Sequence, residues 1–312
     1  MAPLTWLLEQ YFRPVSADPR YRANLSLRHA TLGTAAAHLS YLYPVSTNPN
    51  EHCRNKLAAA YHWQKALQLF RNVISKPSSI GLHNMDALIS TCMLITIHSF
   101  YAPDPDPYKS FVYTPRPQRL STLKWLTVHS GFRLLVEQLA NHISRSIWFP
   151  VMSEAGPRPM AIMDPPSNSH IITTFISLCD ISSTSTVDTN PYLAALAHLL
   201  PYFPLRACLP MQTSFNQLVA FMGRLSPTMH DLIVALDPAA LLIFAYWLAL
   251  MTHLDQWWIT GRATSECMAI VTYLMHNPDE KIQSLLEYPA TVVGITWPTG
   301  CETTAASDEE LR

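Results

Sequence analysis

The sequence has little charge and little glycine. Only 14% of its 312 residues are charged and the net charge is −1, whereas charged residues make up about a quarter of an average globular chain. A nearly neutral chain creates no field that attracts nucleic acid or an acidic membrane. With 8 glycines and no Gly-x-Gly-x-x-Gly, Walker or Gly-x-Ser-x-Gly motif, a phosphate-binding loop or a hydrolase nucleophile turn is not expected. We predict no nucleotide cofactor and no direct nucleic-acid partner.

Closely spaced metal ligands are also missing. Structural zinc sites need ligand pairs a few residues apart, and the sequence contains no Cys-x-x-Cys or His-x-x-x-His pair. We therefore expect no metal and no cofactor of any kind. Isolated cysteines in a long chain are typical of reduced, buried thiols and of an intracellular protein, in the cytoplasm or the nucleus. The six cysteines are Cys53, Cys92, Cys179, Cys208, Cys267 and Cys301.

Long hydrophobic runs are the third absence. The apolar run Ala239–Leu250 gives only twelve residues, and a membrane-spanning helix needs about 20. Near the N-terminus, Leu4–Leu8 is followed at once by Glu9 and Arg13, which argues against a secretory signal. We expect no membrane span.

What the sequence does contain is helical periodicity and a large hydrophobic content of 49%. No segment alternates apolar and polar residues between turn motifs, so no sheet is expected. We predict an all-α protein: one compact domain of stacked antiparallel helices around a buried central helix, over residues 1–300, with a disordered acidic tail over 301–312. The predicted helices are Leu4–Phe12, Arg20–Leu42, Glu51–Ile74, Asn84–Phe100, Leu120–His142, His170–Leu178, Pro191–Leu199, Thr213–Leu225, Pro238–Ile259, Ser265–Met275 and Lys281–Leu286.

Proline, present 25 times, marks the boundaries of these helices. It is concentrated in Tyr101–Gln118 and in Met152–Ser169. Both segments are predicted to be long loops, of the kind that cover sites or remain irregular.

Residues 237–261 are the most informative stretch. Asp237 is suited to cap a helix, Pro238 to occupy its first turn and Gly261 to close it. Apolar and aromatic residues fill two adjacent stripes of this helix, which predicts burial on most sides. One stripe holds Phe244, Trp247, Met251, Leu254 and Trp258, and the other Tyr246, Leu250, His253 and Trp257.

This stretch, with Ala245-Tyr246-Trp247, His253-Leu254-Asp255 and Trp257-Trp258, resembles the C-terminal regulatory domain of fungal zinc-cluster transcription factors of the sterol-uptake-control type. The resemblance covers roughly residues 20–295. These factors carry six clustered cysteines that hold two zinc ions, and no such cluster is present here. The resemblance implies an effector domain without its DNA-binding domain. Further matching motifs are Leu27–Gly33, Ala37–Ser40, Tyr61–His62, Ala66–Leu67, Asn84–Leu94, Trp125–Gly131, Leu134–Leu135, Tyr288–Pro289 and Val293–Gly294.

The aromatic stripe has two interpretations. Phe244, Trp247, Met251 and Trp258 are either core residues or the wall of a cavity for a flat apolar molecule such as a sterol or terpenoid. Core packing is the commoner role of such a stripe. The resemblance favours the cavity, because this part of the family's domain lines its ligand pocket. We retain these four as candidate ligand-binding residues.

Histidine is the remaining candidate for chemistry. A single histidine on an apolar helix face is most often a core residue bonded to a backbone carbonyl, and that is expected of His38, His62, His98, His129 and His253. His253 is the candidate for a tuned catalytic group, because it lies near Trp257. Asp255 cannot act with it on one atom if both lie on a helix, where residues i and i+2 point about 200° apart.

Two functions stay open. One is a free-standing regulator that senses an apolar molecule and acts through a protein partner or a second copy of the chain. The other is a cofactor-independent cyclase or isomerase of a terpenoid or polyketide pathway, working in the same pocket. Loss of the DNA-binding half favours the enzyme, and the absence of a recognisable acid/base pair or nucleophile favours the regulator.

Overall fold

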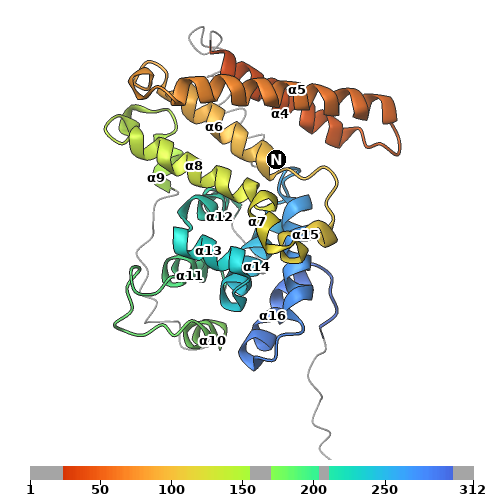
Figure 1. The fold of residues 1–312 in the computed structure, drawn as a ribbon, viewed down its shortest axis with the longest axis vertical. Coiled ribbons are helices and arrows are strands. Elements are labelled where there is room, and N and C mark those ends of the chain that lie inside the picture. Colours follow the sequence, from red (N-terminus) through yellow and green to blue (C-terminus); the bar gives the residue numbers. More distant parts are fainter. Residues whose placement is uncertain (1–23, 155–169, 204–210, 298–312) are drawn as a thin grey trace, which may run out of the picture.

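The hydrophobic segment at the centre of the predictions forms a buried central helix. A computed structural model describes residues 24–154, 170–203 and 211–297, and in it α14 (Pro238–Thr252) packs against α11, α12, α13, α15 and α16 (Figure 1). Every residue of α14 from Ala239 to Met251 is buried. The predicted cap is confirmed, since a carboxylate oxygen of Asp237 accepts the backbone N–H of Ala240 at 2.9 Å.

The all-α prediction is confirmed, because the described ranges form α-helices and short 3₁₀ helices without a strand. One hydrophobic core runs through nearly all of them. The remaining α-helices are α4 (Leu25–Leu42), α5 (Pro49–Ile74), α6 (Met85–Phe100), α7 (Arg116–Thr122), α8 (Lys124–Gln138), α9 (Phe149–Glu154), α10 (His170–Leu178), α11 (Leu193–Leu199), α12 (Met211–Arg224), α13 (Pro227–Ala235), α15 (Thr260–Leu274) and α16 (Glu280–Val292).

The central helix is shorter than predicted. It was expected to continue to Ile259, but it ends at Thr252 and the chain turns before α15. Asp255 has a φ of +47°, a left-handed conformation that interrupts a helix and that aspartate tolerates better than most residues. The buried Gln256 side chain donates to the carbonyls of Leu254 and Asp255, both at 3.1 Å, and so occupies carbonyls freed by the turn. Trp258 therefore does not share a helix face with Trp247.

Gly261 was expected to close that helix, and instead it lies in the first turn of α15. A Cβ atom built there would stand 3.2 Å from the carbonyl oxygen of Ala102 and 3.4 Å from the ring of Pro105. The missing side chain thus permits close approach of the proline-rich loop to α15.

Helices α4 and α5 form an antiparallel pair that lies across the end of α6 (Figure 1). They approach closely at Gly33, where an added Cβ would stand 3.3 Å from the backbone nitrogen of Trp63. The N-terminus of α4 is capped by Asn24, which accepts the N–H of Leu27 at 3.1 Å. The main body of the core is formed by α6, α8 and the helices that follow them in the chain.

Other helix predictions differ in detail. His170–Leu178 is confirmed as α10, whereas Leu120–His142 is two helices, α7 and α8. Thr122 bonds back to the carbonyl of Arg119 at 3.0 Å, a local bond that competes with helix continuation. Helix α13 was not predicted, although Ser226 caps it and Pro227 occupies its first turn. The predicted helix Leu4–Phe12 and the predicted tail 301–312 lie outside the described residues.

The proline-rich segment Tyr101–Gln118 is mainly a loop, as predicted. It contains two 3₁₀ turns, at Pro107–Lys109 and Phe111–Tyr113, and leads into α7 at Arg116. Its partners include α15, through a hydrogen bond of 2.5 Å from Ser110 to Glu266. The second predicted loop, Met152–Ser169, overlaps α9 over residues 152–154, and the rest of it lies outside the described residues.

Among the described residues, no single helix is long and apolar enough to cross a membrane. Helices α13 and α14 pass that test only as a pair, and they are bent by 102° at the break between them.

The described cysteines Cys92, Cys179 and Cys267 are buried free thiols, as predicted. The prediction of burial is wrong for Cys53, which is a free thiol exposed on α5.

Candidate ligand-binding site

Three of the four predicted ligand residues lie in the packed core. Phe244, Trp247 and Met251 are fully buried. The ring of Trp247 stacks between those of Phe221 and Phe244, with centroids 5.2 and 5.3 Å away. Its indole N–H donates to the carbonyl of Leu218 at 2.8 Å. Each group of Trp247 thus has a partner within the protein.

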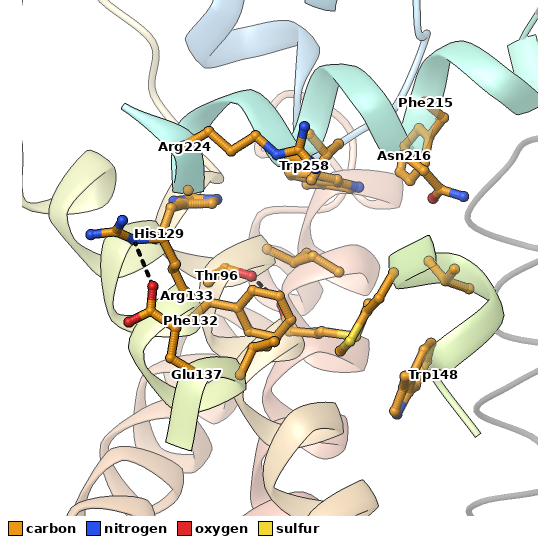
Figure 2. Close-up of a pocket in the computed structure, with 18 residues that line it drawn as sticks. Thr96, His129, Phe132, Arg133, Glu137, Trp148, Phe215, Asn216, Arg224 and Trp258 are labelled. Atoms are coloured by element: carbon orange, nitrogen blue, oxygen red, sulfur yellow. Dashed lines mark hydrogen bonds and ion pairs between the residues drawn. The ribbon is translucent and has the colours of Figure 1, made fainter. Parts of the chain in front are cut away.

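The fourth residue, Trp258, lines a cavity of about 330 Å³ between α6, α8, α9 and α12 (Figure 2). The close-up shows Phe132 on one side of the cavity, Trp258 on the opposite side and Trp148 at one end. Phe244, Trp247 and Met251 are not among its lining residues. The apolar walls consist of Met93, Ile97, Phe132, Val136, Trp148, Val151, Met152, Phe215, Val219, Ala220 and Trp258.

Charged residues mark the solvent side of this cavity. Arg133 and Glu137, one turn apart on α8, form an ion pair of 3.8 Å with side chains 48% and 57% exposed. An exposed pair of this kind contributes little to stability. By contrast, Trp148 and Trp258 are buried, so the cavity extends from the surface of α8 toward the core.

His129 is the polar group placed deepest on the α8 side. It lines the cavity and is 5% exposed. Its Nδ1 lies 2.8 Å from the carbonyl oxygen of Trp125. Because a carbonyl only accepts, Nδ1 carries the proton and Nε2 presents a lone pair. Nε2 has no hydrogen-bond partner among the described residues.

The imidazole of His129 is neutral at pH 7. Burial lowers its pKa to about 4, and the nearby positive charge of Arg262 acts in the same direction. The bond to the Trp125 carbonyl opposes this shift without cancelling it. His129 is therefore a hydrogen-bond acceptor of fixed tautomer inside a mainly apolar cavity.

A buried guanidinium holds this region of α8 in place. Arg262 donates through Nε to the carbonyl of Phe100 at 2.6 Å. The guanidinium carbon also lies 5.2 Å from the centre of the Trp125 ring, within the range of a cation–π interaction. Arg262 thus joins α15 to the end of α6 and to the turn of α8 that carries His129.

Glu266 balances the charge of Arg262. The two side chains lie one turn apart on α15 with a nitrogen–oxygen distance of 3.8 Å. Burial raises the pKa of Glu266, while the hydrogen bond from Ser110 and the charge of Arg262 oppose that rise. This network lies behind the cavity wall and has a structural role.

Arg224 adds a cation at the α12 edge of the cavity. It donates to Nδ1 of His198 at 3.3 Å, and Nε2 of His198 lies 2.7 Å from the carbonyl of Gln217. That carbonyl fixes the His198 proton on Nε2. Burial lowers the pKa of His198 to about 4, so the residue is neutral at pH 7 and accepts from Arg224.

Trp258 is enclosed by aromatic rings. It meets Phe100 edge to face, with centroids 5.8 Å apart, and Phe215 in the same way at 6.4 Å. Its buried indole nitrogen has no hydrogen-bond partner among the described residues. A buried donor without a partner is costly, and because this nitrogen is inaccessible, other atoms of Trp258 form its part of the cavity wall.

The predicted catalytic candidate lies elsewhere. His253 is exposed at the end of α14, and its Nδ1 is 2.9 Å from the carbonyl of Ala249. It does not line this cavity. His253 and Asp255 were predicted to lie on one helix, but α14 ends at Thr252 and Asp255 lies in the turn that follows.

The expectation of core histidines bonded to a backbone carbonyl is confirmed for His129. His253 makes such a bond, but its side chain is exposed, so the expectation of a core position is wrong for it. The other three differ: His62 lies with its Nδ1 2.9 Å from that of His29, His98 stacks on Trp63 and His38 stacks on Trp257. In the described part of the chain, no group of three or more His, Cys, Asp or Glu residues could hold a metal ion.

Sequence reasoning did not single out His129 from the other histidines, nor Phe132 as a wall residue. The spacing of His129 from Trp125 shows only that the ring can reach the preceding turn. Its distinction lies in the cavity formed by α6 and α12, which are distant in sequence.

Comparison of the chain with protein-family models, curated proteins and solved structures finds no match. The candidate site is therefore defined by its own geometry.

Proposed function

We propose that this protein contains a binding domain for an apolar small molecule of the sterol or terpenoid type, and that the ligand occupies the cavity between Phe132 and Trp258. The cavity volume of about 330 Å³ is the observation that carries the proposal. It falls within the range of about 300–1,000 Å³ found for small-molecule sites. Such sites are typically apolar with a few placed polar groups, as here.

The proposed role is regulation of fungal metabolism through a protein partner. This rests on the short motifs that resemble the effector domain of sterol-uptake-control factors. The low charged fraction of 14% leaves neutral surface for a partner or a second copy of the chain. Such a regulator would act in the cytoplasm or the nucleus.

A second candidate function is a cofactor-independent cyclase or isomerase in a terpenoid or polyketide pathway. The specific observation in its favour is the neutral imidazole of His129 in an apolar cavity. An enclosed apolar pocket accelerates a unimolecular reaction by holding its substrate in a reactive conformation. One fixed acceptor would then orient the substrate.

Binding is tested by titrating the pure protein with ergosterol and with farnesol. Ligand in the cavity should change tryptophan fluorescence and raise the melting temperature by mass action. Val219→Phe fills the cavity from α12 and should abolish both responses. Val45→Phe, at an exposed loop position, is the matched control and should retain them. If Val219→Phe retains both responses, as Val45→Phe should, the ligand binds outside the cavity.

Regulator and enzyme are separated by deleting the gene and measuring metabolites and transcripts. One accumulating intermediate that the pure protein converts in buffer would establish the enzyme. Global loss of pathway transcripts, without conversion of any intermediate in buffer, would establish the regulator.

A further inference from the structure

Inside the cavity, the imidazole of His129 offers a hydrogen-bond acceptor and no free donor. Its Nδ1–H is used by the carbonyl of Trp125, 2.8 Å away. Its Nε2 retains a lone pair with no partner among the described residues. The side chain is 5% exposed and lines the cavity. A cavity occupant is therefore the group that can satisfy Nε2.

We propose that the bound molecule is an apolar alcohol whose hydroxyl donates its hydrogen bond to Nε2 of His129. This inference rests on the proposed function and names the ligand's polar group. A neutral imidazole with its proton on Nδ1 can only accept at Nε2. A ketone, aldehyde or ether oxygen at the same place would set a lone pair against a lone pair.

The tautomer of His129 is fixed by residues outside the cavity, Trp125 and Arg262. Trp125 is fixed by the Arg262 guanidinium over its ring, at 5.2 Å, and its carbonyl is one turn before His129 on the same helix. Moving the proton to Nε2 would set the Nδ1 lone pair against that carbonyl, where both groups are acceptors, and flipping the ring would replace Nδ1 by a carbon and lose the bond. The acceptor is thus preorganised before a ligand arrives, which lowers the cost of binding.

Asn216 also lines the cavity, but its amide can turn either a donor or an acceptor to a ligand, whereas the neutral imidazole of His129 offers only an acceptor at Nε2. The hydroxyl of Thr96 donates to the carbonyl of Met93 at 2.7 Å, and the guanidinium of Arg224 only donates. Glu137 accepts, but it lies at the exposed rim in its pair with Arg133. Of the polar groups in the wall, His129 is therefore the buried one whose tautomer is set by a bond within its own helix.

The test compares matched probes of nearly equal size: farnesol with farnesal and with farnesyl methyl ether, and ergosterol with its 3-ketone. The wild-type protein should bind each alcohol several-fold to about tenfold more tightly than its partner, the effect of one hydrogen bond. His129→Phe keeps a ring of similar size and should remove this preference. Thr252→Val is the control, because the hydroxyl of Thr252 also donates to a backbone carbonyl, that of Ala249 at 2.7 Å, and the residue does not line the cavity; it should preserve the preference.

A second measurement uses the wild-type protein alone, so it does not depend on the variant's folding. With histidine labelled by ¹⁵N, the Nε2 resonance of His129 should move when farnesol binds and should not move in the same direction with farnesal. Equal binding of alcohol and aldehyde, or a preference that survives in His129→Phe, overturns this inference and leaves the proposed function standing. If none of the probes binds, the proposed function itself is overturned.

Discussion

The indole nitrogen of Trp247 donates to the backbone carbonyl of Leu218 at 2.8 Å and so joins α14 to α12. The next residue of α12, Val219, lines the cavity. The central helix therefore supports the cavity wall from behind. The predicted ligand residue Trp247 contributes to the site by holding the helix that forms it.

Trp247→Ala should destabilise the protein by about 3–5 kcal/mol, as is typical for a large core aromatic. Trp247→Phe keeps the stack on Phe221 and loses the hydrogen bond to Leu218, so it should cost only about 1 kcal/mol. Urea unfolding at pH 7 measures both. Near-normal stability of Trp247→Ala combined with lost ergosterol binding would instead identify Trp247 as a ligand contact.

The turn at Asp255 gives a second prediction. Its φ of +47° costs an ordinary L-residue about 1–2 kcal/mol, and glycine is free of that cost. Asp255→Gly should therefore leave stability unchanged or raise it slightly, whereas Asp255→Val should lower it by about 1–2 kcal/mol. Thermal unfolding of the two variants checks this. Equal melting temperatures would show that the turn is not held in the left-handed conformation.

A third prediction concerns pH. Burial lowers the pKa of His98 from 6.5 to about 4, so between these values the folded state binds fewer protons than the unfolded state. Stability from this group is complete above pH 6.5 and is lost as pH falls toward 4, by up to about 1.4 kcal/mol per pH unit. His98→Phe should reduce that slope by about this amount and keep the stack on Trp63.

Urea unfolding at several values between pH 4.5 and 7 gives the slope. At pH 7 the variant should be as stable as the wild type or slightly more stable, because Nδ1 of His98 is buried without a hydrogen-bond partner among the described residues. An unchanged slope would show that the pKa of His98 is the same in the folded and the unfolded protein.

The fold was largely predictable because local signals and hydrophobic periodicity agree in α14. Asp237 and Pro238 marked its start, and its uninterrupted apolar sequence indicated burial. Its end was missed because periodicity continues through Trp257 and Trp258, while the left-handed turn at Asp255 has no strong sequence signal. Helix propensity and hydrophobic periodicity do not predict that one residue of a periodic segment adopts a positive φ.

The candidate site was less predictable. Aromatic residues of α14 form the core in this fold, and the cavity lies one layer away, between α8 and α12. A cavity is the space that remains after packing, so it depends on how helices far apart in sequence meet. His129 and Phe132 acquire their positions from that meeting and not from any motif.

The last prediction assigns the fluorescence response to particular tryptophans. Of the 8 in the sequence, the cavity is lined by Trp148 and Trp258. The indole of Trp148 donates to Ser90 at 2.9 Å, whereas that of Trp258 has no partner among the described residues. Trp258 also lies opposite Phe132 across the cavity, whereas Trp148 lies at one end (Figure 2), so a ligand there should change the emission of Trp258 most. Trp258→Phe should remove most of the change caused by ergosterol or farnesol, and Trp148→Phe a smaller part.

Trp63→Phe is the control for this assignment, because Trp63 lies outside the cavity and stacks on His98 at 4.2 Å. It should retain the full response. Binding must be followed in parallel by the rise in melting temperature. This second measurement distinguishes a variant that has lost the fluorescent tryptophan from one that no longer binds the ligand. A variant that loses the fluorescence change and keeps the thermal shift supports the assignment. A full fluorescence change in Trp258→Phe would instead show that another tryptophan reports the ligand: Trp148 of the same cavity if Trp148→Phe loses the change, and a tryptophan outside the cavity if Trp148→Phe keeps it.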